Sequence, residues 1–443
     1  MKRRIRNALI VMLTGILVGV ILLLITFSLP VDGARAHVKE SLHTITREIY
    51  GEDATPLRKH IFEIKDSFTD YLMVQNALED VEGKNVLEHA MYVYHHDLAN
   101  ETTWLTQESL EAMMERGTEG MYLQEYSKYW HGYLIWLKPM LMLMSWATVE
   151  NVLVVVQGLM FLAVVFLAFY KKQPLLAVGI PVTFLFMKPL GVWYSFTLTA
   201  CWGIIMLALL ADLLFYEQIQ KRKLREVYFL VLGIMTAYFD FLTYPITTLG
   251  IPLCFYLVRS LDENNGWWNR LKEIFWSSVS WGVGYIGMWG MKWVIAELTV
   301  QSGTLRNAAW SIIYRTEPLD GYVSVFSGSK RTLTAVLQQY DSLFYWILFA
   351  VILVAAVISF VWCLVKASNK NWAVTMVCLL GAAALPFAWL ILTQNHTAIH
   401  CSFTFRIMSV TVIALWCMIV CSVQTIKRTA QRRSVNEFQN ENK

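Results

Sequence analysis

Apolar runs long enough to cross a lipid bilayer recur along nearly the whole sequence. A hydrocarbon core about 30 Å thick requires roughly 20 apolar residues in a helix, and hydrophobic residues make up 56% of this chain while charged residues make up 16%. This pattern predicts an all-α polytopic membrane protein with about ten transmembrane helices and a large first extracytoplasmic loop. The predicted spans lie near residues 8–29, 150–170, 174–194, 196–216, 227–240, 245–259, 273–298, 343–366, 372–393 and 407–425.

The spans divide the chain into four predicted regions. The basic start MKRRIRN, followed by an apolar run too long for a signal peptide, predicts an uncleaved first helix. After it, apolar residues at helical spacing and the Trp-rich stretch WHGYLIWLKPMLMLMSW predict amphipathic and interfacial helices. The regions are 1–29, the cytoplasmic N-terminus and first transmembrane helix; 30–149, the extracytoplasmic loop; 150–425, the multispanning domain with a second outer loop at 299–342; and 426–443, a cytoplasmic polar tail.

Basic residues predict which side of the membrane each connection faces. Lys and Arg cluster beside the ends of the predicted spans, and in a ten-span arrangement every cluster falls on the same side. Cytoplasmic loops carry such an excess of positive charge, so we expect a multi-pass protein of the cell membrane with both termini in the cytoplasm. These clusters account for the modest net charge of +4, and nucleic acid is not an expected partner.

Two carboxyl groups stand four residues apart in the stretch KDSFTDYLM of the long loop. Asp66 and Asp70 would share one face of a helix, where paired carboxylates can raise one pKa to make a general base or can hold a divalent cation. Asp32, shortly after the first span, has the same two interpretations. The alternative for all three is a solvated acidic face, because the loop is rich in acidic residues.

Aromatic residues gather in the stretch YSKYWHGYLIWLKP. Tyr129 and Trp130 would suit a sugar ring, whose C–H face packs on an aromatic ring while its hydroxyls take hydrogen bonds. His131 adds a polar group and favours a binding site. The alternative is an interfacial aromatic belt, which is common in membrane proteins.

The stretch AYFDFLTYP places a carboxylate at the outer end of a predicted span. Asp240, with Tyr244 close by, is either a solvated cap or part of a polar cavity. Because the connection is short and the next span is interrupted, the pattern favours a cavity.

The stretch QNHTAIHCSFTFR lies between two apolar runs of membrane-spanning length. Its ionisable groups at a membrane boundary indicate a functional site, because such groups are costly there. His396 and His400 are four residues apart and could reach one ion or one phosphate, and a metal would need a third ligand from another segment. Arg406 with these histidines and Asn395 equally describes a pyrophosphate clamp. The alternative is a snorkelling Arg with boundary histidines.

Several familiar motifs are absent from the sequence. There is no GxxxxGK[ST] loop, no GxSxG elbow, no CxxC pair and no HExxH. ATP-driven, serine-hydrolase and zincin functions are therefore disfavoured.

The architecture of a first span, a large outer loop and many further spans resembles the GT-C superfamily of integral-membrane glycosyltransferases. The resemblance covers most of the chain. The motifs LPVDGARAHVKES, DSFTDYLM, YSKYWHGYL, FDFLTYP and QNHTAIHCSFTFR also look like those of a group of bacterial multispanning proteins near that superfamily. The resemblance implies that a sugar passes from a polyprenyl-phosphate-linked donor to a cell-envelope glycan or lipid at the outer face, among membrane lipids.

The resemblance also implies roles for particular residues. An acidic residue of the first outer loop would act as the base on the acceptor, a role carried over to Asp70 with Asp32 and Asp66 as rivals. The superfamily's acidic pair directly after the first span is reduced here to Asp32 alone, so the base is not fixed by the motif. Charge on the leaving phosphate would be stabilised by basic residues, and the candidates are His396, His400 and Arg406. A divalent metal ion is left open.

Two other functions compete with this one. A transporter or flippase for a lipid-linked or anionic substrate would also use an interrupted span and polar groups at a cavity, but it would favour inverted repeats and charges near the bilayer midplane. A membrane assembly or sensor protein would use the outer loop as a binding module, and single substitutions at Asp70 or His396 would leave it working.

Overall fold

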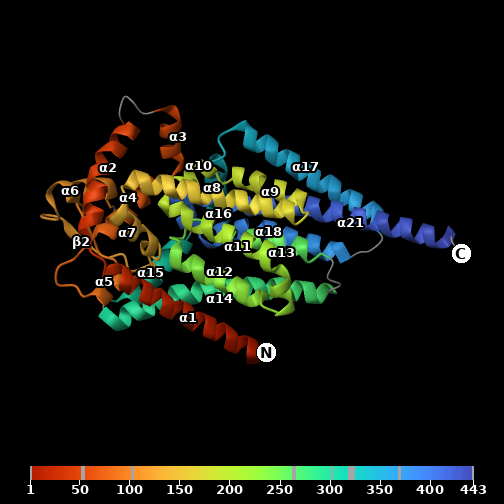
Figure 1. Ribbon diagram of the computed structural model, residues 1–443, viewed down its shortest axis with the longest axis horizontal. Helices are drawn as coiled ribbons and strands as arrows, with labels where there is room; N and C mark the ends of the chain where they lie inside the picture. The colour runs from red at the N-terminus through yellow and green to blue at the C-terminus, as the bar shows by residue number, and fades with distance from the viewer. Residues whose placement is uncertain are drawn as a thin grey trace.

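The computed structural model describes residues 2–50, 55–100, 104–261, 266–300, 303–317, 325–367 and 371–441. These residues are almost entirely helical, and the helices run side by side in a long bundle (Figure 1). The helices of the first loop cover one end of the bundle, and the C-terminal helix projects from the other (Figure 1). The expected all-α architecture is confirmed.

Six segments of the described chain are long and apolar enough to cross a membrane, by length and composition. Their helices carry large exposed apolar side chains, such as Leu17 on the first and Phe166 on the second, as expected where a helix faces lipid. The segments are Ile5–Phe27, Trp146–Tyr170, Phe196–Lys221, Leu343–Lys366, Trp372–Leu392 and Cys401–Arg432. The helices are α1 (Lys2–Phe27), α8 (Trp146–Tyr170), α11 (Phe196–Lys221), α17 (Leu343–Lys366), α18 (Asn371–Leu392) and α21 (Ser409–Glu441).

The other four predicted spans are also helical. Helix α14 is long but carries several charged residues, and the others are shorter than a usual transmembrane helix. The count of ten spans stays a prediction. These helices are α9 (Pro174–Leu185) followed by α10 (Pro189–Trp193), α12 (Arg225–Phe239), α13 (Thr247–Arg259) and α14 (Trp267–Val300).

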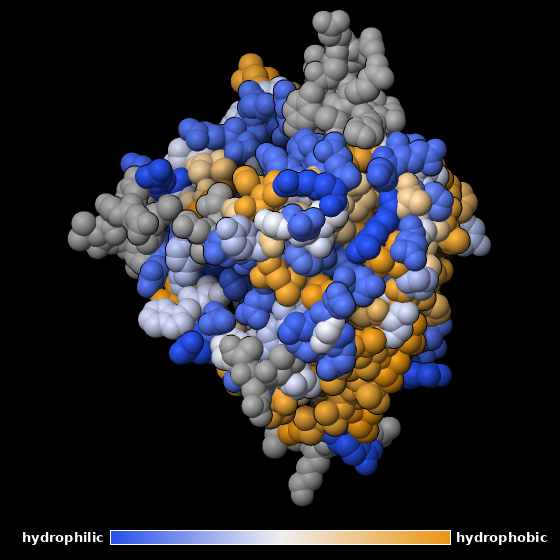
Figure 2. All heavy atoms as spheres, turned by 90° about the vertical axis from the view of Figure 1, so that its left-hand side faces the viewer, coloured by the Kyte–Doolittle hydropathy of each residue, from blue (hydrophilic) through white to orange (hydrophobic). Residues whose placement is uncertain are grey.

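The first loop folds into short helices and a small two-stranded sheet at the end of the bundle. Strands β1 (His95–Asp97) and β2 (Tyr122–Gln124) pair antiparallel, with His96 opposite Leu123. The end of the molecule that this region forms is largely hydrophilic, and apolar residues gather on the flank of the bundle (Figure 2). The helices are α2 (Asp32–Tyr50), α3 (Pro56–Ile64), α4 (Ser67–Leu78), α5 (Val86–Tyr92), α6 (Thr106–Arg116) and α7 (Leu134–Leu143).

Five short helices complete the polar end. Helices α15 (Thr304–Thr316) and α16 (Val325–Gln338) come from the predicted second outer loop. Helices α19 (Gln394–Ile399) and α20 (Cys401–Thr404) and the 3-10 helix η1 (Phe405–Met408) lead from α18 into α21. Helix α19 packs against both α15 and α16. The predicted second outer loop and the segment between α18 and α21 therefore meet here.

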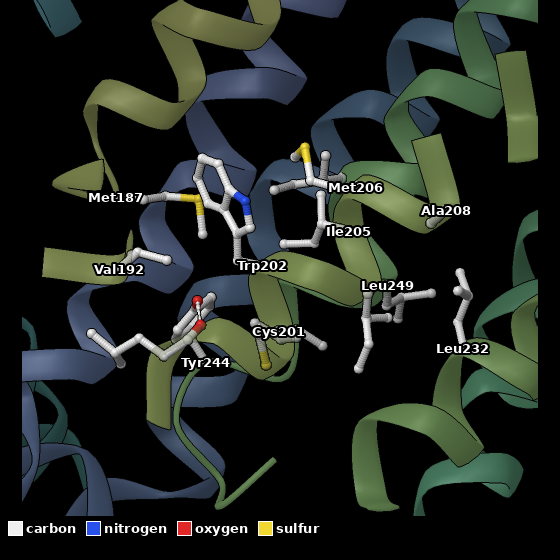
Figure 3. Close-up of a cluster of buried hydrophobic side chains, with 14 of the residues drawn as sticks. Met187, Val192, Cys201, Trp202, Ile205, Met206, Ala208, Leu232, Tyr244 and Leu249 are labelled. Atoms are coloured by element: carbon white, nitrogen blue, oxygen red, sulfur yellow. Dashed lines mark hydrogen bonds between the residues drawn. The ribbon is translucent and has the colours of Figure 1, made fainter. Parts of the chain in front are cut away.

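Helix α11 lies in the packed interior of the bundle. Its Trp202 is fully buried, and the ring centroid lies 4.3 Å from that of Phe184 on α9. Figure 3 shows Trp202, Ile205 and Met206 of this helix among buried side chains of its neighbours. Near its N-terminal end the hydroxyl of Tyr244 donates a hydrogen bond to the Leu198 carbonyl, which anchors the loop between α12 and α13.

Helices α12 and α14 approach each other through glycines. A Cβ atom on Gly233 would lie 2.1 Å from the Trp281 carbonyl oxygen, and one on Gly284 would lie 2.3 Å from the Leu230 carbonyl oxygen. Small residues allow such close backbone contact between membrane helices, where van der Waals packing drives association. The pair therefore depends on the absence of a side chain at both positions.

We expect Gly284→Ala to lower the melting temperature of the detergent-purified protein, because its methyl group forces the two backbones apart. Gly282→Ala is the matched control on the same helix, since a Cβ there would meet nothing within 4 Å. This control is expected to be neutral or to stabilise the helix by up to about 1 kcal/mol, because Ala forms helices better than Gly. Equal melting temperatures for the two variants would contradict the close packing.

Candidate functional site

The loop between α12 and α13 brings three of the sequence motifs together. The ring of Phe241 lies 5.2 Å from that of Tyr129 and 5.1 Å from that of His131, centroid to centroid. The next carbonyl, that of Leu242, accepts a hydrogen bond from His396 Nε2 at 2.9 Å. The FDFLTYP, YSKYWHGYL and QNHTAIH stretches therefore meet at the polar end of the bundle.

Asp240 is engaged within its own loop. Its side chain is buried, and its carboxylate accepts hydrogen bonds from the Thr243 backbone N–H, at 3.0 Å, and from the Thr243 hydroxyl. Such an Asp-centred turn fixes the backbone. Together with the anchor of Tyr244 on α11, it shapes the loop that presents Phe241 and Leu242.

Tyr129 lies at the centre of an aromatic cluster with a cation beside it. Its ring stacks on that of Trp289, with centroids 5.6 Å apart and planes 18° apart. Its hydroxyl accepts a hydrogen bond of 2.9 Å from Arg315 Nη2 on α15. Trp130 points elsewhere, since it is fully buried and its indole N–H donates to the Met288 carbonyl at 2.7 Å.

His131 is buried with both ring nitrogens engaged. Nε2 lies 2.7 Å from the Tyr126 carbonyl and Nδ1 lies 3.2 Å from the Tyr133 hydroxyl. Because a carbonyl can only accept, Nε2 carries the proton and Nδ1 accepts. Burial lowers the pKa of His131 well below its ordinary value, so the ring is neutral. The structure thus places His131 as a link between the aromatic cluster and α7.

The two histidines predicted to act together do lie together. The ring centroids of His396 and His400 are 4.7 Å apart. Burial and the charge of Arg315 lower the pKa of His400 to about 4, so it is neutral near pH 7. Asn395, in contrast, links α19 to α15, because its Nδ2 donates a hydrogen bond to the Tyr314 carbonyl of α15 at 2.8 Å. This bond holds Arg315 and the histidines at one place.

Arg406 is fully buried, and backbone carbonyls take up its guanidinium. Nε donates to the Met187 carbonyl at 2.9 Å and Nη2 donates to the Ile64 carbonyl at 2.9 Å. Nη1 donates to the carbonyls of Ser402 and Phe403, at 3.1 and 3.4 Å. Four hydrogen bonds are therefore made within the protein. Arg406 joins the ends of α3 and α9 to η1.

Asp66 and Asp70 lie at the start of α4, Asp66 as the residue before the helix and Asp70 in its first turn. Asp66 is the N-cap residue, and its Oδ1 accepts from the Thr69 backbone N–H at 3.3 Å. Its Oδ2 is buried and has no hydrogen-bond partner in the described chain. An N-cap uses only one carboxylate oxygen, so the other is left for a further partner.

Asp70 connects the first loop to the transmembrane bundle. Its Oδ1 accepts hydrogen bonds from the Ser195 hydroxyl at 3.0 Å and from the backbone N–H and hydroxyl of Thr197 at 2.9 and 2.8 Å. Its Oδ2 lies 3.9 Å from Lys65 Nζ, which is closer to Glu150 Oε1 of α8, at 2.8 Å. Asp70 is 1% exposed, so it is a buried acid with only a distant counter-charge.

Burial controls the electrostatics of this acidic pair. It raises the pKa of Asp70 to about 7, with the charge of Asp66 adding to the rise and Lys65 and the Thr197 hydrogen bonds opposing it. It also raises the pKa of Asp66, while the bonds from Thr69 and the charges of Arg406 and Lys65 oppose the rise. Both carboxyl groups therefore hold a proton more tightly than free Asp.

We expect Asp70→Asn to remove part of the pH dependence of stability. The unfolded chain loses the Asp70 proton near the ordinary pKa of 3.8, whereas the folded chain holds it to about pH 7. The stability that Asp70 contributes is thus fully present below about pH 4 and is lost as the pH rises through about 7. The variant, which mimics the protonated acid, should melt like the parent at pH 4 and above it at pH 8. The same difference in melting temperature at both pH values would contradict the raised pKa.

Asp32 does not join this pair. It is exposed at the start of α2, and three residues later Arg35 Nε donates to the Leu78 carbonyl at the far end of α4, at 3.0 Å. Leu78 lies eight residues beyond Asp70, which is about 12 Å along a helix. The structure therefore separates Asp32 from Asp66 and Asp70.

Metal ligands do not cluster in the part of the chain that the structure describes. No group of three or more His, Cys, Asp or Glu side chains there is placed to hold a metal ion. The described residues therefore supply no third metal ligand beside His396 and His400.

Sequence reasoning missed Arg315. It lies in the last turn of α15, and its guanidinium carbon is 5.6 Å from the centroid of the Tyr129 ring. Nothing in its local sequence distinguishes it from Arg306, which is exposed on the same helix. Only the contact with a residue 186 positions earlier in the chain marks Arg315 as part of the site.

In comparisons with known proteins, no family model, no curated protein and no solved structure matches this chain. Its class follows from its own helices. Six candidate spans, an almost wholly helical chain and one hydrophilic end define a multi-pass, all-α membrane protein with a polar site at that end of the bundle.

Proposed function

We propose that this protein is a membrane glycosyltransferase of the GT-C type, which transfers a sugar from a polyprenyl-phosphate-linked donor to a cell-envelope acceptor at the outer face. One observation carries the proposal. A carboxylate with an unbonded oxygen, Asp66, and the cluster of Tyr129, His400 and Arg315 lie at the same polar end of the bundle. Arg406 connects them, because it binds the Ile64 carbonyl beside Asp66 and the carbonyl of Phe403, whose ring stacks on His400.

Asp66 is the carboxylate that best suits a general base. An acceptor hydroxyl is a poor nucleophile, so a base must take its proton while the oxygen bonds to the anomeric carbon and the bond from that carbon to the donor phosphate breaks. Asp66 Oδ2 makes no hydrogen bond in the described chain, and a raised pKa strengthens a base. Asp70 has one oxygen saturated by three donors, and it acts by holding α4 against α11.

The aromatic cluster supports a sugar substrate. Tyr126 and Trp289 are only partly buried, and both contact the ring of Tyr129. Aromatic rings beside hydrogen-bonding groups suit the C–H face and hydroxyls of a sugar.

A lipid transporter or flippase is the second candidate, and a groove favours it. Helices α1, α12 and α14 enclose an apolar groove of about 410 Å³, lined in part by Val18, Met235 and Tyr238. Such a surface suits the chain of a lipid-linked substrate that the protein moves across the membrane.

The experiment that tests the proposal is a transfer assay with the purified full-length protein. Radiolabelled polyprenyl-phosphate sugars are offered as a panel with mixed cell-envelope acceptors, and transfer of label from one donor is the expected result. No transfer from any donor, combined with movement of the intact lipid across a vesicle membrane, would overturn the proposal in favour of a flippase.

A further inference from the structure

The cation most available at the polar site is Arg315. It is partly buried on α15, and Nη2 donates to the Tyr129 hydroxyl at 2.9 Å. No carboxylate forms an ion pair with it among the described residues, whereas Arg225 and Arg259 pair with acids. A partly buried guanidinium without an acidic partner has hydrogen-bonding capacity for an anion.

Three groups that are basic or neutral lie near Arg315. Its charge lowers the pKa of Lys128, His396 and His400, behind the larger effect of burial, so all three lie within its field. The ring of His400 makes no hydrogen bond to the described residues and remains partly exposed. Asp240, whose charge acts on Tyr129, is already engaged by Thr243.

Tyr129 strengthens the case for an anion. Its hydroxyl oxygen accepts a hydrogen bond from Arg315, so its own O–H points elsewhere and meets no acceptor in the described chain. Two donors, one guanidinium and one phenol, thus lie side by side. A phosphate oxygen is the type of ligand that accepts from both.

We propose that Arg315, with Tyr129 and His400, binds the phosphate of a polyprenyl phosphate; this inference rests on the proposed function and gives it a donor-binding residue. Arg406, the sequence-based candidate, has its guanidinium taken up by four backbone carbonyls. During transfer the bond between the anomeric carbon and the phosphate oxygen breaks, and that oxygen keeps the electron pair. Arg315 stabilises the charge that develops there.

The test measures binding of a short-chain polyprenyl phosphate without a sugar to the full-length protein in nanodiscs. Arg315→Ala is expected to raise the dissociation constant about 10- to 100-fold, the size of a lost charge-assisted hydrogen bond. Arg315→Lys keeps the charge at the end of α15 but not the fork of donors, and it should restore binding in part. Arg306→Ala, an exposed position on the same helix, should bind like the parent.

Two further ligands identify what Arg315 recognises. Binding of the uncharged polyprenol should be equal in the parent and Arg315→Ala, and inorganic phosphate should compete with the lipid in the parent only. The inference is overturned if Arg315→Ala binds the lipid phosphate like the parent, or if it loses polyprenol to the same degree.

The outcome separates this inference from the proposed function. Arg315-dependent binding without any sugar transfer would retain the phosphate site and reject the transferase. Sugar transfer that Arg315→Ala leaves unchanged would retain the transferase and reject Arg315 as its phosphate ligand.

Discussion

Asp66→Asn should lower the rate of sugar transfer about 10²- to 10⁴-fold, the usual contribution of a general base. The substitution is selective, because Asn is as good an N-cap as Asp and can keep the hydrogen bond to the Thr69 backbone N–H. What it removes is the second carboxylate oxygen, which has no hydrogen-bond partner in the described chain. Initial rates with saturating donor and acceptor measure the effect, and the melting temperature should stay within a few degrees of the parent value.

Two other carboxylates serve as controls for Asp66. Asp32→Asn should transfer like the parent, because Asp32 is exposed beside the far end of α4. Asp70→Asn should lose less activity than Asp66→Asn, since Asn can still accept the hydrogen bonds from Ser195 and Thr197. If Asp70→Asn abolishes transfer while Asp66→Asn retains it, the base is Asp70.

Arg406→Met is expected to destabilise the whole protein. The change keeps much of the side-chain volume but leaves buried carbonyls, among them those of Ile64 and Met187, without their donor. A buried acceptor left unsatisfied costs about 1–3 kcal/mol, so the expected loss is about 3 kcal/mol or more. Against a total of about 5–15 kcal/mol for a typical domain, this should show as a much lower yield of monodisperse protein and a lower melting temperature.

The same substitution at Arg315 is the matched control. Arg315 is partly exposed and has one hydrogen bond in the described chain, to the Tyr129 hydroxyl. Arg315→Met should therefore fold normally and lose polyprenyl phosphate binding. The structural role of Arg406 would be refuted by a variant that melts like the parent and loses only ligand binding.

Hydropathy predicted the architecture well because burial in lipid imposes a strong rule on composition. The all-α membrane class is confirmed, and the predicted spans fall on helices, with the span at 174–194 divided between α9 and α10. Asp66 and Asp70, which were predicted to share one face of a helix, lie at the start of α4, with Asp66 as its N-cap and Asp70 in its first turn. The number of spans and the role of each site residue stay predictions.

Tertiary contacts explain what sequence reasoning missed. Arg406 has the residue type of a phosphate ligand, but its partners Ile64 and Met187 are 342 and 219 residues away in sequence, and only the fold shows that they take up its donors. Arg315, in contrast, was not predicted as a site residue, because it sits in an ordinary amphipathic helix. The small sheet was missed because strands of three residues carry no periodic signal.

The long-range hydrogen bonds of the first loop can form only in a certain order while the chain is being synthesised. Lys65 and Asp70 reach their partners on α8 and α11 only after those helices have been synthesised, and the Ile64 carbonyl waits for Arg406, 342 residues later. At about 5–20 residues per second, that wait is roughly 17 to 70 seconds. The Ile64 carbonyl lacks its donor throughout that interval, so the end of α3 is joined to η1 only after most of the chain has been made.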